Sequence, residues 1–482
     1  MGISESQPAD SKASPPAAQL KRSIGLRTVV STSAGLTFAS STFLVVVQMA
    51  CFLAGDSAWI AIAIAGCLCA LAAAAFSELN GMWPSVNGIR LYILKAFGEK
   101  ASLITSLTYM SVVTLVVGTE AYVLSHVLSA AFPAIKPPYW IFLMLTVASL
   151  VNFCGLKVAG AFQDIITYSV VASIITMSLL ALAKVHYHVP APLHIGAPMN
   201  LLNAVGVAIF LFVGFEWVTP LADEVRSARA IPLGMFIALA TLTVVYALIT
   251  TAMFAGPWGV PHTALQNVNG SRQPIPHIIF ATTALGSAGR AVMIVTSLFM
   301  SLTTFNAGLI GVSRFIYGMA RDQVLPRGLA QISARFSTPY RAVLAVYVIA
   351  LIVSAIVYAT EKFVLLVNLA AATESFIYAF AAASVIALRV KDPSRDRPFR
   401  MVGSLWLPAL TGIVFLAIGI IVFTPAGVDY WGAAVVLVAV ALAWWLYIHF
   451  YALPRLVKIR EETAAKRVSR RPSRRPVSER EP

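Results

Sequence analysis

Long apolar stretches, each able to cross a bilayer as a helix, follow one another along most of the chain. About 20 apolar residues in a helix span the hydrocarbon core, and backbone polar groups inside lipid must be satisfied by a helix or a closed barrel. Barrel strands alternate between apolar and polar positions over about 10 residues, and these stretches do not alternate. The pattern therefore predicts an all-α integral membrane protein of about twelve transmembrane helices, at residues 28–53, 57–79, 103–129, 138–154, 160–184, 201–221, 231–256, 290–318, 341–358, 363–388, 404–424 and 431–453.

Three polar regions lie outside these spans. Residues 1–23 are rich in Ser, Pro and Ala, so we expect a disordered N-terminal tail without a cleavable signal peptide. Residues 454–482 are rich in Arg and poor in aromatic residues, which favours a disordered C-terminal tail. The loop 257–289 contains an apolar piece, 278–285, that is too short to span and is expected to form an external helix on the protein. One twelve-helix domain, residues 24–453, remains between the tails.

The charge of the chain fits a membrane protein with both termini in the cytoplasm. Only 11% of the residues are charged and the net charge is +15, whereas soluble domains carry about 25% charged residues. With both tails inside, 30 of the 35 Lys and Arg residues lie on the cytoplasmic side, as the positive-inside rule requires. We therefore expect a multi-pass protein of the cell membrane that contacts anionic lipid and binds no nucleic acid.

Enzyme and metal chemistry find little support in the sequence. The four cysteines include a Cys-x-Cys pair in an apolar helix, without the converging His and Cys ligands that metal sites need. The chain contains no HExxH, GxSxG or GxxxxGK motif. We expect neither an enzyme nor a cofactor nor direct ATP use. A channel would need a ring of like charges or a filter loop, and neither is visible.

Acidic residues inside the spans are the candidate chemistry. Charged groups are costly in a membrane and usually face a cavity or a partner. Glu120, Glu216 and Glu374 lie well inside spans three, six and ten. Each is a candidate for proton coupling or cation recognition, and the alternative is a structural carboxyl held by hydrogen bonds. Glu78 and Asp164 lie near cytoplasmic span ends, where capping is the simpler interpretation.

Spans one and six contain helix-breaking sequences. Residues 31–42 are crowded with small and hydroxyl side chains, and residues 210–220 combine a glycine with a proline. The two interruptions lie five spans apart, so spans one to five and six to ten would cross in opposite senses. This arrangement matches an inverted repeat whose half-helices meet at the midplane, where free N–H groups favour a carboxylate and free carbonyls an ammonium. Close helix packing is the alternative for the small residues of span one.

Four stretches resemble the amino acid–polyamine–organocation permeases, in that family's order and spacing. They are FSELNGMWPSVNGIRLY at 76–92 with KAFG at 95–98, NFCGLKVAGAFQD at 152–164, FVGFE at 212–216 with EVRSARAIP at 224–232, and SRFIYGMARDQVLP at 313–326 with STP at 337–339. Together they cover most of residues 24–453. The resemblance implies ten core helices in two inverted five-helix repeats (leucine-transporter-like), two further C-terminal helices, and alternating access around a central site.

The same resemblance implies a set of substrate-binding residues. Seven positions match, namely Ala39, Ser40, Ser41, Phe210, Val213, Gly214 and Phe305. The substrate's carboxylate would meet the unwound part of span one at 39–41, and its amine would meet carbonyls freed at 213–214. Phe210 matches an aromatic gate and Phe305 another wall of the site. Glu216 matches a carboxylate that serves proton coupling or cation recognition in several members.

Two departures from the family pattern leave the substrate and the coupling ion open. The family usually has a Gly-Ser-Gly-like element in span one, and this chain has Ala-Ser-Ser at 39–41. The two missing glycines leave room for a substrate without a carboxylate. Some proton-driven members carry a lysine in span five where Val170 stands here. The coupling ion is H+, or Na+ held by hydroxyls such as Thr303 and Thr304.

The sequence thus predicts a secondary active transporter that moves amino acids, or closely related small organic amines, by ion-coupled symport or exchange. A polyamine or amino-alcohol permease or antiporter is the alternative within this class, and a channel is the alternative from another class. The expected partners are the small-molecule substrate and membrane lipid, and a homodimer is left open.

Overall fold

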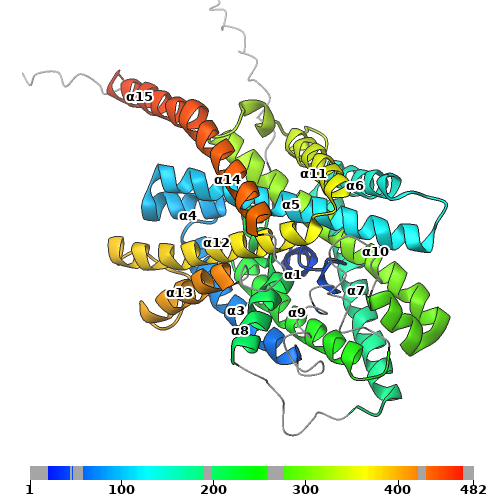
Figure 1. Cartoon of the computed structure of the whole chain (residues 1–482). Helices are drawn as coiled ribbons and strands as arrows, with labels where there is room; N and C mark the ends of the chain where they lie inside the picture. Colours follow the sequence, from blue (N-terminus) through cyan, green and yellow to red (C-terminus); the bar gives the residue numbers. More distant parts are fainter. Residues whose placement is uncertain are drawn as a thin grey trace, which may run out of the picture.

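The chain is almost entirely helical in the computed structural model, which describes residues 20–43, 46, 58–187, 198–258, 276–421 and 430–469 (Figure 1). Nine of the described helices are long and apolar enough to cross a membrane, and two shorter apolar helices accompany them. The only extended pairing in these residues is an isolated bridge between Ile24 and Val225. The all-α membrane architecture predicted from the sequence is confirmed.

The first five spans form one repeat. Its helices are α1 (Leu26–Gly35), α3 (Trp59–Met82), α5 (Glu99–Ala131), α6 (Pro137–Phe153) and α7 (Leu156–Lys184). A short helix that the sequence did not predict, α4 (Gly88–Phe97), lies between α3 and α5. Beyond residue 43 only residue 46 of span one belongs to the described part.

The second repeat follows the same order. Its sixth span consists of α8 (Pro198–Ala208) and two 3-10 segments, η2 (Ile209–Phe212) and η3 (Phe215–Leu221). The later helices are α9 (Ala230–Phe254), α10 (Pro276–Arg321), α11 (Tyr340–Thr360) and α12 (Phe363–Lys391), with a 3-10 turn, η4 (Arg327–Ala330), before α11. Gly286 (φ 73°) interrupts α10. Its first part therefore forms a separate short helix over the predicted piece 278–285.

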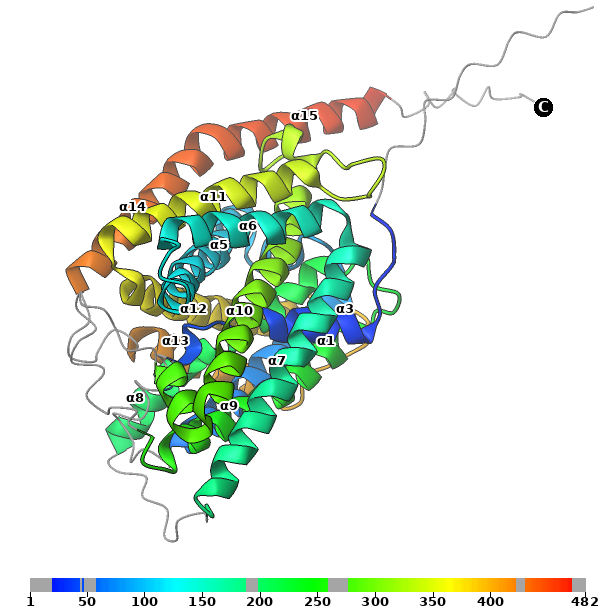
Figure 2. The same cartoon turned by 90° about the vertical axis from the view of Figure 1, so that its right-hand side faces the viewer.

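Equivalent elements of the two repeats pack against each other. Helix α3 packs on α9, α5 packs on α10, and the short helix before α5 corresponds to the short first part of α10. Broken α1 lies among α7, α9, α10 and η3, deep in the bundle (Figure 2). The packing supports two five-helix repeats that place both broken spans at the centre.

The C-terminal helices form the periphery. They are α13 (Trp406–Ile421), which packs on α12, and α14 (Tyr430–Tyr447), which continues through a π-helical turn, η5 (Ile448–Ala452), into α15 (Leu453–Ser469). Most of α14 is apolar and exposed, as a lipid-facing helix must be. Residues 454–469 of the predicted C-terminal tail lie in α15, whose Lys, Arg, Glu and Ala content favours a helix. Residues 470–482 and 1–19 lie outside the described residues.

Candidate functional site

The break in span one begins where α1 ends at Gly35. Thr304 on α10 donates a hydrogen bond from Oγ1 to the Phe38 carbonyl (2.6 Å), and Tyr246 donates from its hydroxyl to the Thr37 carbonyl (2.7 Å). These side-chain hydroxyls thus satisfy carbonyls of the unwound segment that would accept backbone N–H groups in a continuous helix, and they stabilise the break. The hydrogen bond to Phe38 also explains why the hydroxyl of Thr304, one of the two candidate sodium ligands, can be buried.

The break in span six lies directly against the break in span one. Gly214 adopts a left-handed conformation (φ 111°), and a Cβ atom there would lie 2.7 Å from Leu36 Cδ2. A larger residue would strain the backbone and clash with span one. Ser33 also donates from Oγ to the Phe215 carbonyl (2.6 Å). The two interrupted helices meet, as the inverted repeat predicts.

Glu120 on α5 binds the unwound segment. Its Oε1 accepts the backbone N–H of Ser40 (2.6 Å), and its Oε2 accepts that of Ser41 (3.2 Å). The Ser301 hydroxyl donates to the same Oε1, and the Ser40 hydroxyl lies 2.8 Å from Ser301 Oγ. Glu120 is 1% exposed. The N–H groups expected to meet a substrate's carboxylate are therefore bonded to a carboxylate of the protein.

Glu216 and Glu374 form a second acidic centre. Glu216, on η3, accepts hydrogen bonds from the hydroxyls of Tyr109 (3.1 Å) and Tyr378 (2.8 Å). The carboxyl of Glu374, on α12, lies beside that of Glu216. Both Glu374 oxygens are buried without a hydroxyl, amide or amine donor. Two adjacent buried carboxyls cannot both carry charge without severe repulsion, so this pair is suited to hold a proton.

Thr303 belongs to a polar network between α1, α7 and α10. Gln163 Nε2 donates to the Ser31 carbonyl (3.1 Å) and to Thr303 Oγ1, and Thr167 Oγ1 lies 2.7 Å from Thr303 Oγ1. Asn306 Nδ2 donates to Gln163 Oε1 (2.8 Å). Gln163 is thus one of several α7 side chains that reach span one, together with Asp164, whose Oδ1 accepts from the Ser31 hydroxyl (2.5 Å), and Thr167, which donates to the Ser31 carbonyl (3.3 Å). Val170, which stands where some proton-driven members of the family carry a lysine, is buried on the same helix about two turns beyond Gln163.

The remaining substrate candidates differ in their surroundings. Phe210 and Ser41 line a small cavity together with Val116, Thr119, Leu366 and Val367. Phe305 is fully buried and does not line this cavity. The Gly214 carbonyl accepts a hydrogen bond from the backbone N–H of Trp217 (3.1 Å), so it is already engaged.

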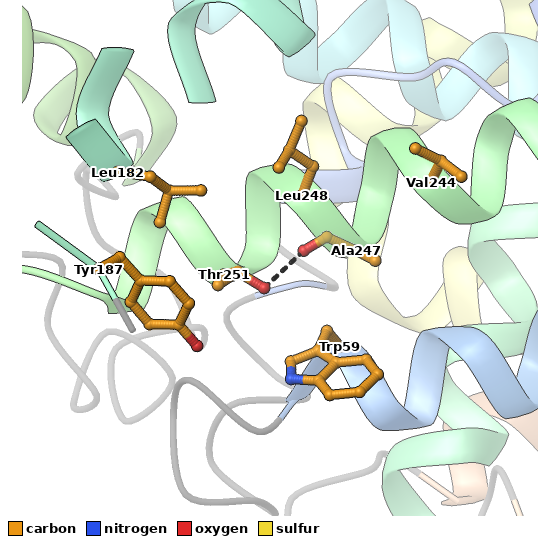
Figure 3. A pocket seen from close by; sticks show the side chains of 7 residues that line it. All are labelled: Trp59, Leu182, Tyr187, Val244, Ala247, Leu248 and Thr251. Atoms are coloured by element: carbon orange, nitrogen blue, oxygen red, sulfur yellow. Dashed lines mark hydrogen bonds between the residues drawn. The ribbon is translucent and has the colours of Figure 1, made fainter. Parts of the chain in front are cut away.

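A larger pocket of about 370 Å³ lies away from these residues. Figure 3 shows its lining, in which four side chains of α9 face Trp59 of α3 and the end of α7. The lining is Trp59, Leu182, Tyr187, Val244, Ala247, Leu248 and Thr251. None of the candidate residues reaches it, so this apolar pocket is not the central site.

A buried ion pair closes the end of the bundle that is predicted to face the cytoplasm. Arg314 on α10 donates to Glu224 (2.8 Å), and both side chains are at most 2% exposed. The Glu224 carbonyl accepts the backbone N–H groups of Ser23 (2.9 Å) and Ile24 (3.3 Å), and Arg226 N–H donates to the Ile24 carbonyl (3.0 Å). The segment before α1 is thereby tied to the loop after η3. Burial raises the pKa of the Glu224 carboxyl, and the Arg314 guanidinium offsets part of that shift.

Comparison with known proteins identifies the family. A family model described as amino acid permease matches residues 24–451. The chain belongs to the amino acid permease family. An uncharacterised transporter of Mycobacterium tuberculosis is 28% identical over 433 residues, which cover 88% of this chain and 91% of that protein. The branched-chain amino acid permease BcaP of Bacillus subtilis is 23% identical over 82% of this chain and 86% of its own.

Solved transporter structures share the fold of this permease. A manganese transporter of Eremococcus coleocola superposes with a TM-score of 0.59 at 11% identity, covering 90% of this chain and 94% of its own. A Na+-coupled sialic acid symporter gives 0.54 at 11% identity, over 83% and 89% of the two chains. The family match and the transporter relatives, and not these structures, show that the permease is a multi-pass membrane transporter and not an enzyme. Among the described residues no cluster of His, Cys, Asp or Glu could hold a metal ion.

Several residues of the permease site were not predicted from the sequence. Gln163 was visible as a polar residue inside an apolar span, and that signal could have marked it. Tyr109 and Tyr378 carried no such signal, because tyrosines are common in apolar helices. Thr119 was equally hidden, since its importance follows from the cavity that it lines.

Proposed function

We propose that this permease moves amino acids or closely related small organic amines across the membrane by alternating access around its two helix breaks. One observation carries the proposal. The interrupted spans contact each other through Leu36 and Gly214 and are surrounded by buried carboxyls on α5, η3 and α12. Such a centre offers acceptors for a substrate's ammonium group.

We propose protons as the coupling ion. The Glu216–Glu374 pair can gain and lose a proton inside the bundle, as two interacting carboxyls do. Sodium at Thr303 is disfavoured because the Gln163 amide nitrogen points at the same oxygen atoms that would coordinate the ion. An amide donor and a cation cannot both occupy that space.

Counterflow in liposomes tests the function. The purified protein is reconstituted into liposomes loaded with an unlabelled amino acid or amine, and labelled solute is added outside. A carrier accumulates the label transiently by exchange, whereas a channel only equilibrates it. An imposed pH gradient, compared with a sodium gradient of equal size, then identifies the coupling ion. If every amino acid and amine tested in this way equilibrates without exchange, the proposal is contradicted.

A further inference from the structure

We infer that Glu120 occupies the place at which span one would bind a substrate's carboxylate, and that the central site therefore takes an organic ammonium ion without a carboxylate group. The inference rests on the proposed function and narrows its substrate class. It starts from the hydrogen bonds of one side chain and from the cavity beside it.

The hydrogen bonds of the unwound segment leave no free anion site at its centre. Each Glu120 oxygen accepts one backbone N–H, from Ser40 and Ser41 respectively. These are the donors that a broken helix would offer to an anion. Ser301, which also binds Glu120, fixes the carboxylate from the α10 side. A ligand carboxylate would have to displace Glu120 or share its donors.

The charge of the surroundings opposes such sharing. The described residues contain three buried arginines and no buried lysine. Each arginine pairs with an acidic residue outside this centre: Arg90 with Glu99 and Asp322, Arg314 with Glu224, and Arg389 with Glu78. Among the buried residues that the structure describes, no arginine or lysine is left to neutralise a second carboxylate next to Glu120. A cation is the ligand that complements this charge.

A small cavity bounded by Ser41, whose backbone N–H donates to Glu120, offers further contacts for an amine. Thr119 lines it next to Glu120 in the sequence, and its Oγ1 is buried without a hydrogen-bond partner. Such an orphan hydroxyl is suited to a polar group of a ligand. Phe210 lies in the same lining, and an aromatic face attracts an ammonium ion. The cavity measures about 10 Å³, so an amine with a hydroxyl group that widens it would meet Thr119 and Phe210 beside the segment that Glu120 holds.

Pairs of molecules that differ only by a carboxylate test the inference. Suitable pairs are ethanolamine with serine, cadaverine with lysine, and agmatine with arginine. Competition for counterflow in wild-type liposomes should show the amine binding about ten- to a hundredfold more tightly than its amino acid, as the loss of hydrogen bonds to a charged group implies. Wild-type preference for the amino acid in every pair would overturn the inference and leave the proposed function intact.

Variants of the same helix sharpen the test. Glu120→Ala frees the two N–H groups, so the preference should shift toward the amino acid of each pair. Thr119→Val should weaken ethanolamine more than cadaverine, because only ethanolamine has a hydroxyl. Ser125→Ala is the matched control, since this buried α5 hydroxyl bonds only its own helix backbone and the ring of His126. An unshifted preference in Glu120→Ala would contradict the inference.

Two further outcomes are decisive. If Glu120→Ala does not fold, the wild-type preference alone decides, because it needs no variant. Transport of neither member of any pair, while another amino acid is exchanged in counterflow, would overturn the inference and leave the proposed function intact.

Discussion

Removing one partner of the buried Glu224–Arg314 pair should release the closed end of the transporter. Both side chains are at most 2% exposed, so Glu224→Ala leaves an unpaired guanidinium in the protein interior. Breaking a buried ion pair in this way costs about 3–5 kcal/mol. Since about 1.4 kcal/mol changes an equilibrium tenfold, the closed form should lose roughly two to four orders of magnitude relative to open forms.

The raised pKa of Glu224 makes the double variant informative. The direction of this pKa shift means that burial destabilises the charged Glu224 carboxylate by more than the Arg314 charge stabilises it. Burying the pair therefore brings little net stability over an apolar pair of similar volume. Replacing both Glu224 and Arg314 by Met should restore closure almost completely, although each single variant opens the transporter.

Thiol labelling measures this closure. In a background without the four native cysteines, Thr32→Cys reports on α1, because Thr32 is 2% exposed and its hydroxyl has no hydrogen-bond partner. An impermeant reagent is applied to inverted vesicles. Labelling should be slow in the parent protein, fast in each single variant of the pair, and slow again in the double variant.

The neighbouring exposed ion pair provides the control. Asp223 and Arg321 lie 3.7 Å apart with 36% and 47% of their side chains exposed. Exposed pairs contribute about 0–1 kcal/mol, so Asp223→Asn should label like the parent. Parent-like labelling of both Glu224→Ala and Arg314→Ala would refute the reasoning. Labelling of the double variant as fast as the single variants would refute the desolvation argument.

Three shorter predictions follow from the same structure. Glu216→Gln should abolish uphill uptake driven by a pH gradient while counterflow partly survives; retained pH-driven uptake would make this carboxyl structural. Transport should be unchanged when sodium is replaced by N-methyl-D-glucamine. Gln163→Ala should lower the free energy of unfolding in detergent by about 1–3 kcal/mol, because it leaves buried polar groups unpaired. A cysteine at Val457 should be protected from impermeant reagents in intact cells and one at Ala134 labelled; the reverse pattern would invert the predicted topology.

The fold was predictable because lipid imposes simple rules on sequence. Apolar length located the spans, and the glycine and hydroxyl clusters located both breaks. Two features escaped for physical reasons. Helix α4 is too short and too polar to resemble a span, and α15 is charged enough to resemble a disordered tail although its residues favour a helix.

The site was only partly predictable, because its contacts join residues far apart in the chain. The acidic residues were identifiable by their cost in a membrane, but their donors were not. Glu120 meets Ser40 from a position 80 residues away. The case of Gln163 is instructive: it lies seven residues before Val170, which is about two turns, so both occupy nearly the same face of α7. The contacts of Gln163 with span one therefore follow from its level along the helix axis, which the sequence pattern does not show.

The three buried carboxyls differ chiefly in what surrounds them. Glu120 is bonded to backbone N–H groups, so only a ligand cation or a change in span one alters its state. Glu216 meets two phenols and the carboxyl of Glu374, so a proton is what this pair can exchange. Helix α5 connects the two centres, because it carries Glu120 and also Tyr109, the donor to Glu216. These positions lie eleven residues apart, about 16 Å along a rigid helix. Substrate and proton therefore need not share a site: a shift of α5 on substrate binding would change the hydrogen bond that Glu216 receives from Tyr109.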